Sequence, residues 1–536
     1  MEYWNLYNYL GKKKKKIAIR GSKLNNDDYH LVVNAWIMNN KGEFLITQRS
    51  ANKSHPLMWE CTGGSALLNE TSQEAAIREV KEELGIDVSK SKAELVGSTR
   101  RFYELCPDIL DVWLFKKNIS IEKITIQEEE VNDVMWASKE KIIELFKQGK
   151  FEPNTFFEKV LYPNQNIYYL GFNANNAICN TSFFKGMITL NPNHEKGNIY
   201  YTKEFIKEKD DIFLDKYKKY LVSTMKELSK SNKNCLFIAF NNKIKDLLID
   251  EKKYNIITVD NKIKYDLNDK KETRKQLEKK IPVLKTSWID KKISYKEAQK
   301  ISKSEIFVIQ GKEGAGGNNT YYIDSKEKFE KYSLKCNNKY LISKYIKHLP
   351  INITVIIGKY NDIIFPVSIQ LIKLTDDNFK YVGADFIYYQ TLNNNIKEKV
   401  ESYTKIIIKT LKENGYKGII GIDYIIDDND NVLFMEFNPR FQSSSFILSQ
   451  HLEKYCSTSI AELHYLATQD KYIGNIFIDR IDKSFVNCYD EKEFTEFKYG
   501  KIIKYGYYKK NKTSCFRRIF DYSILKHGSF EKRDND

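Results

Sequence analysis

The sequence has no hydrophobic run long enough to cross a lipid bilayer. A membrane-spanning helix needs about 20 consecutive apolar residues, and no run in this chain of 536 residues approaches that length. The first residues, Met1–Asn5, do not form a secretory signal. We therefore expect a protein that has no membrane partner.

Cysteine chemistry is sparse as well. The eight cysteines are scattered and none forms a Cys-x-x-Cys pair, so neither a disulfide framework nor a zinc site is predicted. A reducing compartment suits such a chain, and we expect a cytoplasmic protein. The hydrophobic share of 42% supports globular folding, and 536 residues are too many for one core, so several domains are expected.

Positive charge is abundant but unevenly placed. The net charge is +16, yet residues 1–160 contain equal numbers of basic and acidic residues, so the whole excess lies further on. This difference favours a domain boundary near Pro163, with residues 1–160 acting as a self-contained unit. The local basic run Lys12–Lys16 is expected in a solvated turn. Basic surface could attract nucleic acid, although phosphorylated small substrates would also account for it.

The first chemical motif is an acidic helix. Glu79, Glu82 and Glu83 are spaced so that their carboxylates share one helical face. Crowded carboxylates repel one another unless a cation lies between them, and oxygen ligands at this density suit Mg²⁺ or Mn²⁺. The alternative is a solvated helix stabilised by i,i+4 ion pairs.

The spacing around this helix matches a known motif. Gly64 is followed by five residues and Glu70, then by seven residues and Arg78-Glu79-Val80, one residue, Glu82-Glu83, one residue and Gly85-Ile86. Residues 1–160 therefore resemble a Nudix hydrolase. The resemblance implies an α/β/α sandwich that hydrolyses a nucleoside diphosphate linked to another group.

The resemblance also implies roles for single residues. Glu79, Glu82 and Glu83 would hold the metal, with Glu82 and Glu83 counted as catalytic, while Arg78 and Glu70 orient them. The metal would polarise the bridging phosphate and lower the pKa of an attacking water.

A base is expected from a later loop. Glu130, the last residue of the acidic run 128–130, is the candidate, and a solvated loop is the alternative. Arg49 and Lys53 follow a predicted strand and could contact phosphate, or could equally lie on the surface.

Residues 164–275 are predicted to form a small open α/β domain. Buried strands are expected at 166–172, 234–240 and 254–260, and an amphipathic helix at 203–231. Strands that alternate with helices are typical of such a domain. No catalytic pattern is present there.

A glycine-rich turn begins the second informative region. Strand 306–310 leads into residues 311–317, which contain four glycines, and strand 321–323 follows. Backbone N–H groups in such a turn can surround an anion. A merely flexible turn is the alternative.

Further on, acidic residues converge on a predicted hairpin. If the chain turns at Asn429-Asp430, Asp423 lies opposite Glu436. Asn438 then shares the face of Glu436 by the two-residue period of a strand. Two carboxylates and an amide oxygen among apolar neighbours favour a bound cation, while a surface hairpin with polar residues facing water is the alternative.

The order of these features is typical of the ATP-grasp fold. A glycine-rich hairpin, strands at 339–346 and 351–357, and Asp…Glu-x-Asn-Pro-Arg follow one another. Residues 276–450 resemble that family, and 164–275 resemble the α/β domain that precedes it. The resemblance implies an α+β fold that binds ATP and magnesium and joins a carboxylate to an amine.

The resemblance assigns the ATP-grasp residues as follows. Magnesium ligands carry over onto Asp423, Glu436 and Asn438, and Arg440 matches an arginine near the acyl phosphate. Nucleotide contacts fall on the adenine strand at Ser343 and Lys344 and on the loop at Gly311, Lys312, Gly314, Gly316 and Gly317. Many relatives carry lysine where this chain has Gln310, whose amide can still donate a hydrogen bond to phosphate.

The sequence as a whole thus predicts an α/β multi-domain enzyme. We expect a Nudix domain at 1–163, an α/β domain at 164–275, an ATP-grasp domain at 276–470 and a basic extension at 471–536. The favoured function is a bifunctional Nudix hydrolase and carboxylate–amine ligase that uses Mg²⁺ or Mn²⁺ and ATP. Its rivals are a nucleotide sensor with a degenerate ATP-grasp half, and a nucleic-acid-associated enzyme that uses the basic extension with its interleaved aromatic residues.

Overall fold

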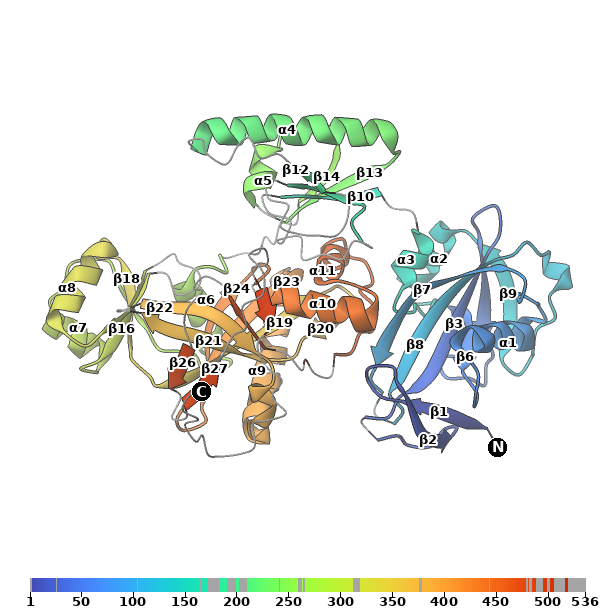
Figure 1. Cartoon of the computed structure of the whole chain (residues 1–536), viewed down its shortest axis with the longest axis horizontal. Helices are drawn as coiled ribbons and strands as arrows, with labels where there is room; N and C mark the ends of the chain where they lie inside the picture. The colour runs from blue at the N-terminus through green and yellow to red at the C-terminus, as the bar shows by residue number, and fades with distance from the viewer. Residues whose placement is uncertain are drawn as a thin grey trace, which may run out of the picture.

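A computed structural model shows three folded parts that follow one another along the chain (Figure 1). In the part of the chain that the structure describes, no helix is long and apolar enough to span a membrane. The described residues are 2–25, 27–103, 105–163, 166–171, 183–189, 199–201, 210–240, 242–258, 263, 266–311, 319–375, 378–442, 444–478, 481, 484–487, 495–498, 502–505 and 516–518.

The N-terminal part is a mixed sheet with helices on both faces. Its central strands, β3 (His30–Met38) and β8 (Asp108–Lys116), pair in parallel. Val33 shares a buried cluster with α1 (Ser72–Leu84), and Trp36 shares one with α2 (Lys139–Lys147) on the opposite face. The predicted α/β/α sandwich is therefore confirmed. The other elements are β1 (Tyr3–Tyr7), β2 (Lys13–Ile19), β4 (Phe44–Arg49), β5 (Trp59–Glu60), β6 (Thr62–Ser65), β7 (Lys92–Arg101), β9 (Val131–Ala137), α3 (Phe157–Leu161) and the 3₁₀ turn η1 (Ile121–Lys123).

The basic run near the N-terminus lies in a strand, so the prediction of a turn there was wrong. Lys14 and Lys16 are two residues apart in β2 and therefore point the same way. Both ammonium groups bind the buried carboxylate of Asp28, at 2.5 and 2.7 Å. This shared partner explains why the run is extended.

Helix α1 is defined by strong signals at both ends. Thr71 and Glu74 form a capping box at its N-terminus, and Gly85 ends it with a φ of 66°. Ala75, Ala76, Val80 and Leu84 are fully buried against the sheet. This apolar face sets the rotation of the helix and therefore the direction in which its glutamates point.

The middle part is a five-stranded parallel sheet in the order β12-β11-β10-β13-β14. Helix α4 (Asp210–Ser231) lies over it (Figure 1), with Tyr217, Leu221 and Met225 buried in the cluster between them. The three predicted strands are present, and residues 203–209 of the predicted helix lie outside the described residues. The bounds are β10 (Asn166–Leu170), β11 (Gly186–Thr189), β12 (Ile199–Tyr201), β13 (Cys235–Ala239), β14 (Asn255–Thr258) and α5 (Asn242–Leu247).

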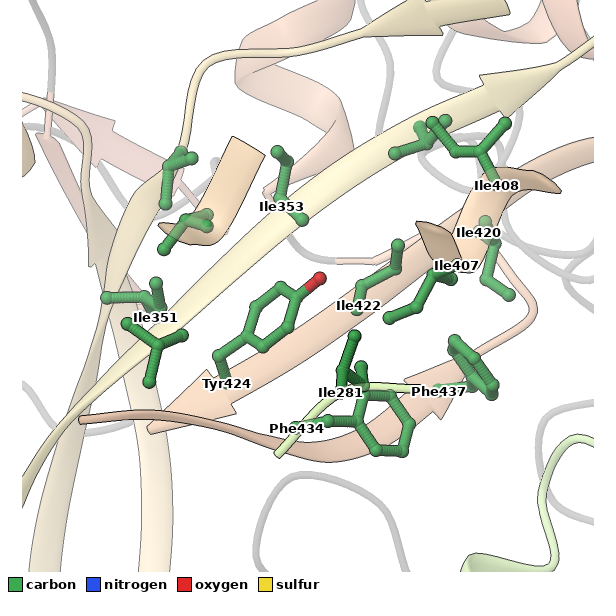
Figure 2. Close-up of a cluster of buried hydrophobic side chains, with 14 of the residues drawn as sticks. Ile281, Ile351, Ile353, Ile407, Ile408, Ile420, Ile422, Tyr424, Phe434 and Phe437 are labelled. Carbon is green, nitrogen blue, oxygen red and sulfur yellow. The ribbon is translucent and has the colours of Figure 1, made fainter. Parts of the chain in front are cut away.

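The C-terminal part is built on one long sheet that divides into two lobes. The smaller lobe packs α7 (Tyr295–Ser302) and α8 (Lys326–Lys335) on β15–β18. In the larger lobe, Figure 2 shows Ile353, Ile422 and Tyr424 in one buried cluster with Ile407 of α9 (Asn394–Glu413). The remaining bounds are α6 (Lys270–Leu277), β15 (Ser287–Ile289), β16 (Phe307–Gly311), β17 (Thr320–Ile323), β18 (Tyr340–Lys344), β19 (His348–Ile357), β20 (Asp362–Ile364), β21 (Ser368–Thr375), β22 (Asn378–Asp385), η3 (Tyr388–Thr391), β23 (Gly418–Asp427), β24 (Val432–Asn438), α10 (Ser445–Cys456), α11 (Ile460–Thr468), β25 (Ser484–Asn487), β26 (Thr495–Lys498), β27 (Ile502–Tyr505) and β28 (Phe516–Arg518).

The N-terminal sandwich is joined to the C-terminal part through α10. Arg100 of β7 donates hydrogen bonds to the carbonyls of Tyr9 (2.9 Å) and Tyr455 (2.5 Å), and its guanidinium lies over both rings. The backbone N–H of Ser98 donates to the hydroxyl of Ser457 (3.0 Å). Arg100 is buried by these contacts. Residues 1–160 therefore form a specific interface with the C-terminal part. The balanced charge of these residues does not predict that interface.

Candidate active sites

Arg78 organises the acidic face of α1. Its guanidinium donates to Glu70 (2.7 Å), Glu79 (3.0 Å) and Glu82 (2.7 Å). It also donates to the carbonyl of Ser65 in β6 at 3.0 Å. Glu79 is buried while the Glu82 side chain is half exposed. The structure thus brings together the predicted metal ligands Glu79 and Glu82, with Arg78 between them.

Gly64 allows Glu79 to lie directly against the backbone of β6. A Cβ atom at position 64 would stand 2.3 Å from a carboxylate oxygen of Glu79, so any side chain there would displace it. The glycine that opens the motif is therefore required for close approach.

Glu83 is the predicted ligand without a cationic partner. Among the described residues, no hydrogen bond or ion pair reaches its carboxylate, although the side chain is buried. Burial raises the pKa of Glu83 to about 8; the nearby charge of Lys53 opposes this rise, and the charges of Glu79, Glu60 and Glu130 add to it. A buried acid among other acids is costly unless a cation joins it.

A divalent cation therefore fits the chemistry of this donor set, although the described side chains do not form a finished cage. Among them, no three His, Cys, Asp or Glu residues already converge as a metal site. Arg78 pairs with one oxygen each of Glu79 and Glu82, whereas the Glu83 carboxylate has no ion pair in the described part of the chain.

Glu130, the predicted base, lies close enough to influence Glu83. Its carboxylate forms an ion pair with Lys53. Arg49 pairs with Glu60 at 2.6 Å. Both basic residues that could have contacted phosphate are thus neutralised by carboxylates at the edge of the acidic cluster.

Magnesium is expected to change the pH dependence of stability through Glu83. Its folded pKa of about 8 lies above the ordinary value of 4.5, so the folded state binds the proton more tightly. The resulting stabilisation is fully present below pH 4.5 and is lost as the pH rises through about 8.

At pH 8.5, roughly half a unit above that folded pKa, millimolar Mg²⁺ should raise the melting temperature by a few degrees, because a cation stabilises the ionised carboxylate. At pH 6 the gain should shrink. Differential scanning fluorimetry with and without Mg²⁺ measures both. In Glu83→Gln the metal-dependent gain should disappear, and an unchanged gain in that variant would contradict the assignment.

A second candidate site is a cavity of about 380 Å³ between the two lobes of the C-terminal part. The smaller lobe contributes Gln310 and Ser343, and the larger lobe contributes Asp423 and Glu436. Helix α6 forms a further wall. This volume falls within the range typical of small-molecule sites.

The predicted pairing of the acids is present in the hairpin. Asp423 of β23 lies opposite Glu436 of β24, as expected. The turn differs from the prediction, because the register shifts by one residue between Asp423 and Tyr424, and Tyr424 pairs with Phe434. A bulge in β24 absorbs the extra residue and returns Asp423 to its expected partner.

The Asp423 carboxylate is surrounded by amides. Asn352 donates to it at 2.5 Å and Asn438 at 2.9 Å. Burial, together with the nearby charge of Glu436, raises the pKa of Asp423 to about 7. Asn438 in turn accepts a hydrogen bond from Arg440 at 3.0 Å. The three predicted magnesium ligands and Arg440 therefore form one connected group on the cavity wall.

Glu436 faces two cations that the sequence analysis missed. The Lys270 ammonium lies 3.3 Å from one of its carboxylate oxygens, and that buried oxygen has no hydrogen-bond partner. Arg274 donates to the carbonyl of Met435 (2.8 Å), while its second terminal nitrogen has no partner in the described part of the chain. Burial lowers the pKa of Arg274 to about 10. The unpartnered nitrogen of Arg274, beside the Lys270–Glu436 ion pair, suits a charged ligand in this cavity.

A sequence signal for these cations does exist. Lys270 and Arg274 are four residues apart on a helix capped by Asp269, which places them on one face. Basic residues are so common in this chain that the pair does not stand out.

The remaining predicted nucleotide contacts lie as follows. Gln310, Ser343, Lys344 and Arg440 line the cavity. The amide of Gln310 donates to the hydroxyl of Thr320 at 3.2 Å. Gly311 ends β16, and the loop positions Lys312, Gly314, Gly316 and Gly317 lie outside the described residues.

Comparison with known proteins identifies the N-terminal part. The family model for the NUDIX domain matches residues 28–160. A Nudix hydrolase of Listeria innocua is 40% identical over 164 residues, which span 30% of this chain and 94% of the relative. The chain belongs to the Nudix family. A second Nudix hydrolase, from Listeria monocytogenes, is 38% identical over 163 residues, with the same two coverages of 30% and 94%.

The Nudix protein carries a second enzyme domain. The family model for the ATP-grasp domain matches residues 267–444, a range that includes α6. Among solved structures, the biotin carboxylase domain of Hydrogenobacter thermophilus 2-oxoglutarate carboxylase has a TM-score of 0.44 and 16% identity, covering 60% of this chain and 74% of that one. Staphylococcus aureus N5-carboxyaminoimidazole synthetase has a TM-score of 0.40 and 18% identity, covering 60% and 82%. The two family-model matches confirm both predicted families. Nudix and ATP-grasp enzymes generally use a divalent metal, and ATP-grasp enzymes use ATP.

Proposed function

We propose that this protein is a cytoplasmic bifunctional enzyme. Its Nudix domain hydrolyses a nucleoside diphosphate linked to another group, and its ATP-grasp domain joins a small-molecule carboxylate to an amine. Mg²⁺ serves both reactions. The observation that carries the proposal is the presence of two separate, buried acidic centres, around Glu83 and around Asp423, each in a domain whose family uses a metal.

In the Nudix reaction, Glu79, Glu82 and Glu83 would hold the cation. A bound Mg²⁺ supplies charge neutralisation for the bridging phosphate and lowers the pKa of water. Glu130 accepts the proton of the attacking water, which its position beside Glu83 and Lys53 supports. Arg78 keeps Glu79 and Glu82 in place.

In the ATP-grasp reaction, an oxygen of the substrate carboxylate attacks the γ-phosphorus of ATP. The bond to the bridging oxygen breaks, ADP leaves, and an acyl phosphate remains. The amine nitrogen then attacks the acyl carbon, loses a proton and displaces phosphate. Asp423, Glu436 and Asn438 hold the magnesium that accompanies ATP, while Arg440 binds the acyl phosphate.

Lys270 and Arg274 supply phosphate contacts in this proposal. Relatives commonly place a lysine at the position of Gln310, and these two cations of α6 reach the same cavity from another wall. Their burial strengthens any ion pair with phosphate. These two cations thereby compensate for the lysine that relatives carry at the position of Gln310.

A metabolite screen tests both halves of the proposal. The full chain is incubated with ATP, Mg²⁺ and a library of carboxylates and amines, and mass spectrometry follows ADP, phosphate and a condensation product. ATP binding without product from any pair would favour the second candidate, a nucleotide sensor, for which Gln310 is the supporting feature. Binding of nucleic acid that weakens with salt would instead support the third candidate, a nucleic-acid-associated enzyme.

Lys270→Met is expected to weaken ATP binding about tenfold, which corresponds to about 1.4 kcal/mol. The variant removes a buried cation that lies beside Glu436. Isothermal titration calorimetry with Mg-ATP measures the change, and Gln310→Lys should shift affinity in the opposite direction. Lys271→Met is the matched control, since Lys271 is the exposed neighbour on the same helix. Equal losses in both lysine variants would contradict the role given to Lys270.

A further inference from the structure

A second cavity, of about 220 Å³, lies where the Nudix domain meets the segment that follows α11. Arg49, Glu60, Tyr103 and Asn154 of the Nudix domain line it. Tyr472 and Asn475 complete its wall. These two residues come after the end of the ATP-grasp match at residue 444, so two distant parts of the chain build one cavity.

The cavity adjoins the Nudix carboxylates. Glu60, which lines it, is close enough for its charge to contribute to the raised pKa of Glu83. Asn34, another lining residue, pairs across the sheet with Gly63 in the strand that supports Glu79. A substrate whose phosphate lies at the acidic cluster could therefore extend into this space.

The segment that closes the cavity is firmly attached to the Nudix domain. Lys471 forms an ion pair with Glu158 at 2.9 Å, and the hydroxyl of Thr155 donates to the carbonyl of Asn475 at 3.1 Å. The N–H of Phe477 donates to the carbonyl of Arg100 at 3.0 Å.

Close packing at Gly474 holds the segment further. Its φ of +81° is strained for other residues, and a Cβ there would meet the carbonyl of Thr155 at 2.6 Å. Tyr472 and Asn475 are thus held on either side of a fixed backbone.

The charges of the cavity argue against a second phosphate site. Arg49 is paired with Glu60 at 2.6 Å, and Arg101 is paired with Asp108 at 2.8 Å. Glu152 adds a further carboxylate to the wall. With its arginines neutralised, this wall offers hydrogen bonds from amides and phenols and no net positive charge.

Asn475 contributes an exposed amide side chain to this wall. No hydrogen bond to its amide is present among the described residues, although its backbone carbonyl is held by Thr155. Tyr472 packs its ring against Phe146, and burial raises the pKa of its phenol to about 12, so the hydroxyl stays protonated and can donate. These groups suit an uncharged ring that carries both donors and acceptors.

We propose that this cavity binds the uncharged, hydrogen-bonding ring of the Nudix substrate, and that Tyr472 and Asn475 help to select it. The inference rests on the proposed Nudix hydrolysis. Specificity follows because a site built to hydrogen-bond one ring leaves its own groups unpaired when another ring enters. The Nudix half then depends on residues that lie beyond the ATP-grasp domain.

The test uses full-length wild-type protein, Asn475→Ala and Tyr472→Phe. Tyr472→Phe keeps the ring that packs on Phe146, and thermal unfolding checks that both variants fold. The probes are ATP, GTP, CTP and UTP, which differ in the base, and ADP-ribose and ADP-glucose, which differ in the sugar. Formation of the nucleoside monophosphate with Mg²⁺, separated by chromatography, gives kcat and KM for each.

For the preferred probe we expect KM to rise about tenfold in Asn475→Ala, the size of one lost hydrogen bond to a polar group, with kcat nearly unchanged. The differences in kcat/KM between probes should become smaller. This should hold among ATP, GTP, CTP and UTP if the ring is a nucleobase, and between ADP-ribose and ADP-glucose if the ring is a sugar. Gln469→Ala is the control, because Gln469 is an exposed residue at the end of α11 and does not line the cavity. An unchanged KM and ranking in both cavity variants would overturn the inference.

Failure of the proposed function is distinguishable from failure of this inference. If wild-type protein hydrolyses no probe, the hydrolase proposal falls for these substrates, and calorimetry with the same probes decides the cavity. Binding that weakens in Asn475→Ala but not in Gln469→Ala supports the cavity as a ring site. If no probe binds to the wild-type protein, the inference that the cavity is a ring site is overturned.

Discussion

Replacing Glu83 by glutamine is expected to lower Nudix hydrolysis by at least about 100-fold, since loss of even an indirect metal contact costs 10–100-fold. Glu83 is the buried carboxylate of α1 that Arg78 does not neutralise. Glutamine has nearly the same shape but cannot carry the negative charge that a divalent cation requires. Formation of the nucleoside monophosphate from nucleoside diphosphate derivatives with Mg²⁺ measures the loss.

Two comparisons separate this effect from misfolding. Glu94→Gln changes an exposed glutamate of β7 in the same domain and should leave hydrolysis unchanged. Glu82→Gln should also impair hydrolysis, and it additionally removes one partner of Arg78. Near wild-type hydrolysis in Glu83→Gln would remove the basis for the metal assignment.

Glu436→Gln is expected to stop ADP formation while the Nudix reaction continues. The change removes an anionic group from the cavity, leaves Lys270 without its partner and weakens the binding of Mg-ATP. Asp423→Asn should act in the same direction. Coupled detection of ADP measures the ligase half, and formation of a nucleoside monophosphate from a Nudix substrate monitors the other site in the same preparation.

Asp428→Asn is the matched control for this hairpin. Asp428 is an exposed acid in the turn between the same two strands, where it lies 3.7 Å from Lys347. Its replacement should leave ATP use intact. If calorimetry detects no ATP binding to the wild-type protein and Glu436→Gln changes nothing, the ligase proposal would be withdrawn and the ATP-grasp half would be a scaffold.

Short-range patterns predicted the two acidic centres well. The Nudix spacing is local, because Glu70 to Glu83 lie on one helix and its cap, and helix geometry places them together. The opposition of Asp423 and Glu436 was predicted correctly even though the turn was placed wrongly, since the bulge in β24 lies between the turn and the acids. Motifs of this kind depend little on the rest of the fold.

Contacts between distant segments could not be predicted in the same way. Lys270 reaches Glu436 only because α6 packs beside β24, more than 160 residues further along the chain. Likewise Tyr472 reaches the Nudix cavity because Arg100 and Thr155 hold its segment. Neither segment contains a residue spacing that predicts which distant segment it contacts. The packing that joins them is a property of the complete fold.

The interface at Arg100 defines what can be exchanged between related proteins. A chimera that replaced residues 1–163 with another Nudix domain would keep an acidic helix but lose Arg100, which binds the carbonyl of Tyr455 in α10. It would also lose the threonine against which Gly474 fits. The unit that can be transplanted is therefore discontinuous. The N-terminal sandwich has to be transferred together with α10 and with the segment after α11 that carries Tyr472.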